Sequence, residues 1–159
     1  VLLEDQDRSL WDADLIAEGA ARVERALSSR RFGPFTLQAA IAAVHAESPS
    51  VAETDWAQIV ALYELLLRVE PSPVVELNRT VALAMRDGPA AGLAAVDELL
   101  EAGELTDYPP AHAARADLCR RLGRKAEAAV AYRRALGLTK EASQRKFLEA
   151  RLAEVTTDE

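Results

Sequence analysis

The feature that most constrains this 159-residue chain is a set of landmarks that recur every 34 or 35 residues. Gly88 and Gly123 lie 35 residues apart, each between two stretches with helical patterning. Tyr63, Asp97 and Tyr132 follow the same period, at intervals of 34 and 35 residues. A period in this range is typical of repeat proteins, in which each short unit buries its apolar face against its neighbours. The sequence therefore predicts a stack of similar units.

The clearest unit runs from Ala111 to Leu138 and has the pattern of two helices joined at a glycine. In its second helix Ala128, Tyr132 and Ala135 are spaced by 4 and 3 residues, which places them on one helical face. Small residues let two helix backbones approach closely, and the aromatic ring fills the space beside them. This pattern resembles a tetratricopeptide (TPR) repeat, a 34-residue helix–turn–helix unit.

Two earlier segments follow the same pattern. One contains Tyr63 and ends before Pro71, a residue type that cannot continue a helix. In the segment between the two tyrosine units, Asp97 stands at the aromatic position. We expect the adjacent Val96 to take its place in the core, and the packing of this middle unit is the point at which the pattern is weakest.

Composition supports a helical fold. The chain has 32 alanines, 22 leucines and only 5% aromatic residues, and Ala and Leu lead the helix-propensity ranking. The sequence therefore predicts an all-α fold, a TPR-like right-handed stack of about eight antiparallel helices in a single domain. Residues 1–33 would form an N-terminal segment and first helix, 34–140 the repeat units, and 141–159 a capping helix and tail. The expected helices cover about 12–30, 34–46, 56–70, 74–87, 89–101, 110–122, 124–138 and 141–155.

Several classes of protein are disfavoured. No apolar run approaches the roughly 20 residues of a membrane span, and the acidic N-terminus lacks the basic segment of a secretory signal. Cys119 is the single cysteine, so an internal disulfide is excluded, and its helical phase predicts a buried, inert thiol. We expect a fragment of a longer, cytoplasmic protein.

The sequence offers no recognisable catalytic chemistry. A glycine-rich phosphate loop and the HExxH and GxSxG motifs are all absent. His45 and His112 are far apart, and we expect a helix cap or surface role for the first and a packing role for the second. The sequence therefore predicts no catalytic, cofactor-binding or metal-binding residue, and a protein that is not an enzyme.

The formal net charge is −7 and the pI is near 5.0, which disfavours direct binding to nucleic acid. The charge is uneven, because residues 111–159 alone carry a net charge of +4. This basic end is either a set of solvated helix faces or a docking surface for an acidic partner.

TPR stacks present a concave surface lined by the first helix of each unit, and the repeat phase identifies the residues expected there. Arginine and asparagine donors suit the recognition of carboxylates and of the backbone of an extended peptide, although they could equally be solvated scaffold residues. The candidate partner-binding residues are Asn78, Arg79, Arg86, Asp117, Arg120 and Arg121, with Ala82, Met85, Ala113 and Gln38 nearby.

Several stretches together resemble one family. They include EDQDRSLWDADLIAEG at 4–19, LQAAIAAVHAE at 37–47, TDWAQIVALYELLL at 54–67, PSPVVELNRTVALA at 71–84 and HAARADLCRRLGR at 112–124. In this order they resemble the C-terminal, TPR-like extension of bacterial extracytoplasmic-function (ECF) sigma factors. The resemblance covers essentially the whole chain.

The resemblance implies a parent protein whose upstream domains read promoter DNA, while this chain controls or supports their activity in cis. Its partners would be the upstream sigma domains, core RNA polymerase or another protein. Asp5, Asp7, Arg8 and Trp11 would lie beside the junction and are candidates for contact with the sigma domains, although Trp11 could equally serve to anchor a helix start.

Two alternatives stay open. One is a generic TPR scaffold that binds a peptide or protein and is unrelated to transcription. The other is an all-α ligand-binding or enzymatic domain, which predicts a closed apolar pocket with converging polar groups.

Overall fold

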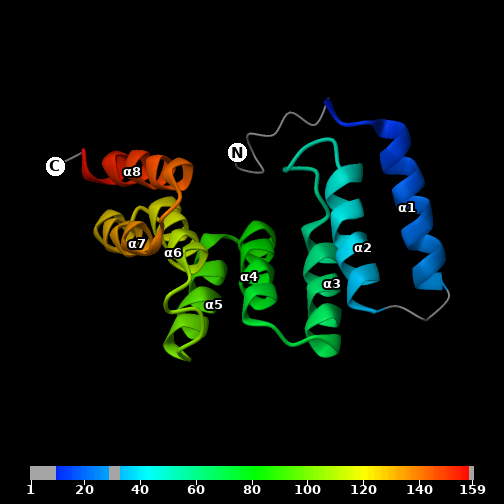
Figure 1. Cartoon of the computed structure of the whole chain (residues 1–159), viewed down its shortest axis with the longest axis horizontal. Helices are drawn as coiled ribbons and strands as arrows, with labels where there is room; N and C mark the ends of the chain where they lie inside the picture. The colour runs from blue at the N-terminus through cyan, green and yellow to red at the C-terminus, as the bar shows by residue number, and fades with distance from the viewer. Residues whose placement is uncertain (1–9, 29–32, 158–159) are drawn as a thin grey trace. The chain divides into compact units, whose positions relative to one another are not determined.

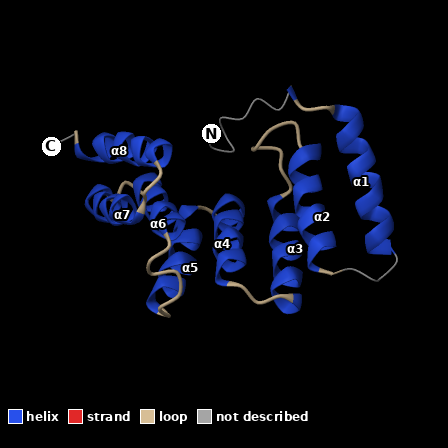
Figure 2. Cartoon of the chain, viewed as in Figure 1, coloured by secondary structure: helices blue, strands red, loops and turns tan. Residues whose placement is uncertain are grey.

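The computed structural model describes residues 10–28 and 33–157, and these residues form eight α-helices (Figure 1). No strand occurs among the described residues, as Figure 2 shows, so the predicted all-α class is confirmed. The helix boundaries lie within a few residues of those expected from the sequence. The helices are α1 (Ala13–Ser28), α2 (Pro34–Glu47), α3 (Trp56–Val69), α4 (Pro73–Asp87), α5 (Pro89–Glu101), α6 (Pro109–Arg121), α7 (Lys125–Leu138) and α8 (Ala142–Thr156).

The chain divides into two compact units, Val1–Arg79 and Thr80–Glu159, and the boundary falls within α4. We call them the N-terminal and the C-terminal unit and describe each by itself. In both units, helices that are consecutive in the chain pack against one another.

In the N-terminal unit the core lies between α2 and α3, where Leu37, Ile59 and Leu66 are at most 1% exposed. Of Thr54 and Asp55, the two N-cap candidates in the sequence, Asp55 caps α3, since its side chain accepts a hydrogen bond of 3.0 Å from the Gln58 amide. Helix α1 packs on α2, yet none of its residues is buried. Helix α1 therefore contributes fewer buried contacts to this unit than α2 or α3, each of which has four buried residues.

In the C-terminal unit, close helix packing depends on small side chains. Ala128 and Ala135 are fully buried and Tyr132 is 1% exposed, as the 4-and-3 spacing predicts. Ala111 and Ala116 of α6 are also fully buried. The alanine-rich composition therefore fills helix interfaces as well as favouring helix formation.

The two repeat glycines both adopt a backbone conformation with positive φ between two helices. Gly88 and Gly123 both have positive φ, +97° and +73°, and each ends one helix just before the next begins. At Gly123 the α6 carbonyls are satisfied by a Schellman motif, in which the amide of Arg124 donates to Cys119 O and that of Gly123 to Arg120 O. Glycine meets this geometry without the strain that a Cβ atom would introduce.

Asp97, at the aromatic position of the middle unit, is used for an ion pair. Its carboxylate lies 2.6 Å from Arg115 Nε, and Arg115 lies 3.7 Å from Glu127, so charged groups connect α5, α6 and α7. Val96 is fully buried, as expected. The middle unit therefore keeps an apolar core at Val96, while the Asp97 carboxylate pairs with Arg115 of α6.

Helix α8 lies at the end of the C-terminal unit and buries few of its side chains. Leu148 and Val155 are buried, whereas Phe147 is 42% exposed, and the Arg151 guanidinium lies 5.4 Å from its ring centroid. Helix α8 also stabilises its neighbour, since Arg145 donates to Leu136 O (2.8 Å) and Thr139 O (3.0 Å) at the end of α7.

A very close helix contact in the C-terminal unit lies at Gly92, and the sequence pattern does not reveal it. A Cβ atom at this position would lie 2.4 Å from Ala84 Cβ and 3.1 Å from Ala84 Cα. The α4 backbone therefore leaves no room for a side chain on this face of α5.

We predict that Gly92→Ala lowers the free energy of unfolding of the C-terminal unit by about 1–3 kcal/mol, because overpacking outweighs the gain in helix propensity. Gly137→Ala is the matched control, since nothing lies within 4 Å of its Cβ position. This control should be neutral or stabilising by up to about 1 kcal/mol. Urea denaturation measures both, and equal stability of the two variants would contradict the close contact.

Candidate functional site

The predicted partner-binding residues are distributed over both units. Asn78 and Arg79 lie on α4 within the N-terminal unit, whereas Arg86 lies on the part of α4 that belongs to the C-terminal unit. The other three residues, Asp117, Arg120 and Arg121, lie on α6. The expectation for Ala82 is wrong, because this residue is only 2% exposed and unavailable to a partner.

Several of the predicted donors already have partners within the chain. Arg79 is half-buried and lies 2.6 Å from Glu76, and its guanidinium is also 3.8 Å from Glu64. Arg86 donates two hydrogen bonds to the Asp87 carboxylate, at 2.8 and 2.9 Å, and this bonding lowers the pKa of Asp87. A partner carboxylate would have to compete with these internal pairs.

The structure brings Asp117 and Arg120 together on α6, with Tyr132 of α7 beside them. The Arg120 guanidinium lies 2.6 Å from Asp117, and hydrogen bonding to Asp117 raises the pKa of Arg120. Burial raises the pKa of Tyr132, whose hydroxyl also interacts with Arg120. This cluster fixes the position of Arg120, while the adjacent Arg121 is exposed.

Of the four residues predicted to contact upstream domains, Asp5, Asp7 and Arg8 lie outside the described residues. Trp11 is described and precedes Asp12, whose side chain accepts hydrogen bonds from the amides of Asp14 and Leu15 at the start of α1. Trp11 therefore stands at a helix start, as one interpretation of the sequence suggested.

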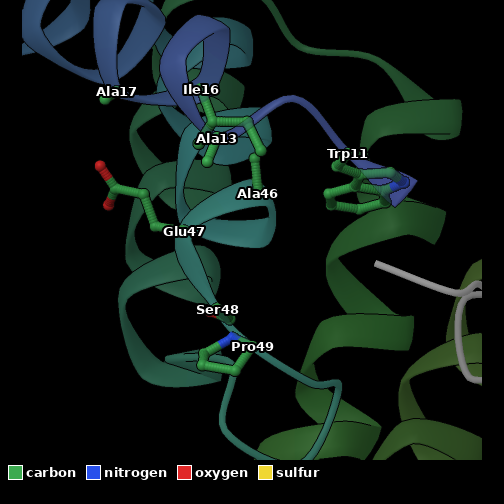
Figure 3. A pocket seen from close by; sticks show the side chains of 8 residues that line it. All are labelled: Trp11, Ala13, Ile16, Ala17, Ala46, Glu47, Ser48 and Pro49. Atoms are coloured by element: carbon green, nitrogen blue, oxygen red, sulfur yellow. The ribbon is translucent and has the colours of Figure 1, made fainter. Parts of the chain in front are cut away.

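Trp11 also lines an open groove of about 510 Å³ between the start of α1 and the end of α2, which we call the α1–α2 groove. In Figure 3 the indole ring lies on one side, and the residues at the end of α2 lie on the other. A second cavity of about 260 Å³ runs along the same two helices, and all of its lining residues are apolar. The groove is lined by Trp11, Ala13, Ile16, Ala17, Ala46, Glu47, Ser48 and Pro49.

Apolar side chains are also exposed at this end of α1. Leu10 is 82% and Leu15 is 66% exposed, next to the groove lined by Trp11 and Ile16. Large apolar side chains that gather beside an open groove are a mark of interaction sites. Neither cavity is the closed pocket with converging polar groups that a small-molecule site predicts, because among the described residues only Glu47 and Ser48 are polar residues that line either one.

The isolated chemical groups have structural roles. His45 packs edge-to-face against Trp56, with ring centroids 5.2 Å apart, and His112 Nε2 lies 2.8 Å from Thr106 O. Within residues 10–28 and 33–157, no three His, Cys, Asp or Glu side chains gather as a metal site would require. None of the described helices combines the length and apolarity needed to cross a membrane.

Comparison with known proteins identifies a longer relative. The chain is 46% identical to an uncharacterized protein of Rhizobium meliloti (strain 1021) over 152 residues, which are 96% of this chain. The aligned region is 36% of that relative, so the chain spans about a third of its length. No protein-family model and no solved structure matches the chain.

Cys119 gives a direct test of the packing around α6. The thiol is fully buried, and burial raises its pKa, so the reactive thiolate is scarce near neutral pH. We predict that native Cys119 reacts with a maleimide or an aromatic disulfide at least about tenfold more slowly than the denatured chain, and faster as the pH rises. A native rate equal to that of the denatured chain would show that the thiol is accessible.

Proposed function

We propose that this chain is a regulatory protein-interaction domain on the C-terminal side of an ECF sigma factor, and that the parent protein initiates DNA-templated transcription in the cytoplasm. The domain is not an enzyme in this proposal and needs no cofactor. Its partners are the upstream sigma domains, core RNA polymerase or a further protein. The net charge of −7 argues that promoter DNA is bound by the parent's other domains.

One observation carries the proposal: Trp11, which belongs to one of the two stretches that resemble the family rather than a generic TPR, lines the α1–α2 groove. EDQDRSLWD ends one residue after Trp11, and Trp11 lines the groove together with Ile16 and Pro49. Tryptophan is over-represented among the residues that contribute most to protein–protein binding. The groove therefore offers an apolar docking site beside the residues on which the resemblance depends.

The helical organisation supports the same interpretation. Repeat stacks of paired helices with TPR-like spacing serve mainly as binding scaffolds. The relative is almost three times as long as the aligned region, which agrees with a domain that acts within a larger polypeptide. The incomplete burial of α1 is what we would expect of a helix that another surface covers.

The alternative is a plain TPR-like scaffold unrelated to transcription, and the α6 cluster favours it. Asp117 fixes Arg120 beside the exposed Arg121, an arrangement that could bind the carboxylates of an extended peptide. The sequence upstream of Val1 in the parent separates the two proposals. A helix-turn-helix pattern there supports the sigma factor, and its absence supports the scaffold.

The test uses the full-length parent and transcription from its target promoter. We predict that Trp11→Ala changes transcription in the same direction as deletion of residues 1–159, because loss of an anchoring tryptophan weakens binding by about tenfold or more. Phe35→Ala is the matched control, since Phe35 is 88% exposed and does not line the groove, and it should leave transcription unchanged.

Two outcomes would contradict parts of this account. Unaltered transcription after deletion of the domain would remove the regulatory role. An effect of deletion without an effect of Trp11→Ala would keep the role but place the contact away from the α1–α2 groove. Circular dichroism of each variant shows whether the fold is intact.

A further inference from the structure

In the C-terminal unit the exposed face of α5 carries acidic residues and the exposed face of α7 carries a basic residue. The exposed face of α5 contains Ala90, Ala94, Glu98 and Glu101, and that of α7 contains Ala126, Val130, Arg133 and Gly137. Each set follows the helical repeat, so its members share one side of the helix.

The charged positions of the two faces are equivalent in the repeat. Glu98 and Arg133 are 35 residues apart, the same spacing as Gly88 and Gly123, so an acidic position of one repeat corresponds to a basic position of the next. Val130 is 63% exposed and stands at the centre of the α7 face. Small residues on both faces allow two helices to approach closely.

Two charged residues next to these faces form ion pairs within the C-terminal unit. Asp97 is paired with Arg115 at 2.6 Å, and Arg134 is paired with Asp107 at 2.9 Å. In contrast, no side chain among the described residues forms an ion pair with Glu98 or Arg133. The charges that point outward therefore remain for a partner.

We propose that the chain forms a two-fold symmetric dimer, in which the α5 face of one copy packs on the α7 face of a second copy. Two-fold symmetry makes the contact twice, because α7 of the first copy meets α5 of the second. Two Glu98–Arg133 pairs then lie around a centre of Val130 and alanine side chains. A second copy fits these faces because it carries the complementary charge for each of them: its Arg133 meets Glu98, and its Glu98 meets Arg133.

The test is charge exchange in the full chain, followed by sedimentation equilibrium at several concentrations. Arg133→Glu and Glu98→Arg should each raise the dissociation constant of the dimer at least about tenfold, because like charges then face one another twice. An equimolar mixture of the two variants should dimerise as the unaltered protein does, since each contact again pairs opposite charges. Higher salt should weaken the unaltered dimer.

Lys146→Glu is the matched control, because this exposed lysine on α8 undergoes a similar change of charge outside both faces. It should leave the dissociation constant unchanged. A chain that is monomeric at all concentrations would overturn the proposal, and so would a dimer that neither reversal weakens. Failure of the mixed variants to dimerise would also overturn it, because rescue requires direct contact between the two faces.

Discussion

Close approach of paired helices through small side chains is the constraint on which the C-terminal unit depends. Gly92 lets α5 pack directly on the backbone of α4, and fully buried alanines, among them Ala111 and Ala128, allow similar contacts between α6 and α7. Because these contacts need backbone proximity, the unit has little tolerance for larger residues at them. The left-handed glycines at 88 and 123 reverse the chain between the helices.

The sequence predicts most of this fold because its information is local and repeated. Helix boundaries follow from propensity, from cap residues such as Asp55 and from helix-starting prolines such as Pro109. The contact at Gly92 could not be predicted in this way, since a glycine within a helical pattern is ambiguous until its neighbour is known. The exposure of Phe147 could not be predicted either, because an apolar residue in a helical stripe normally faces the core.

The candidate site was less predictable than the fold. Repeat phase places residues on a helix but does not show which charges already have partners, and Arg79 and Arg86 prove to be paired internally. Trp11 was identified through the family resemblance, whereas its groove depends on how α1 lies on α2, which no local pattern encodes. The sequence shows that Asp97 replaces an aromatic residue of the repeat, but only the structure gives the reason, which is its ion pair with Arg115.

In this account the two ends of the chain have different physical characters. The C-terminal unit has a core built on small residues, while α1 is an amphipathic helix with no buried side chain beside an open groove. Such a helix gains most of its stability from whatever covers it.

Hydrogen exchange of the α1 amides tests this claim most directly, by comparing the 159-residue chain with the full-length parent. We expect rapid exchange in the chain alone and at least about tenfold slower exchange in the proposed full-length parent, if another of its domains covers the helix as we propose. Equal exchange rates in the two proteins would contradict the claim that α1 and its groove are a docking site.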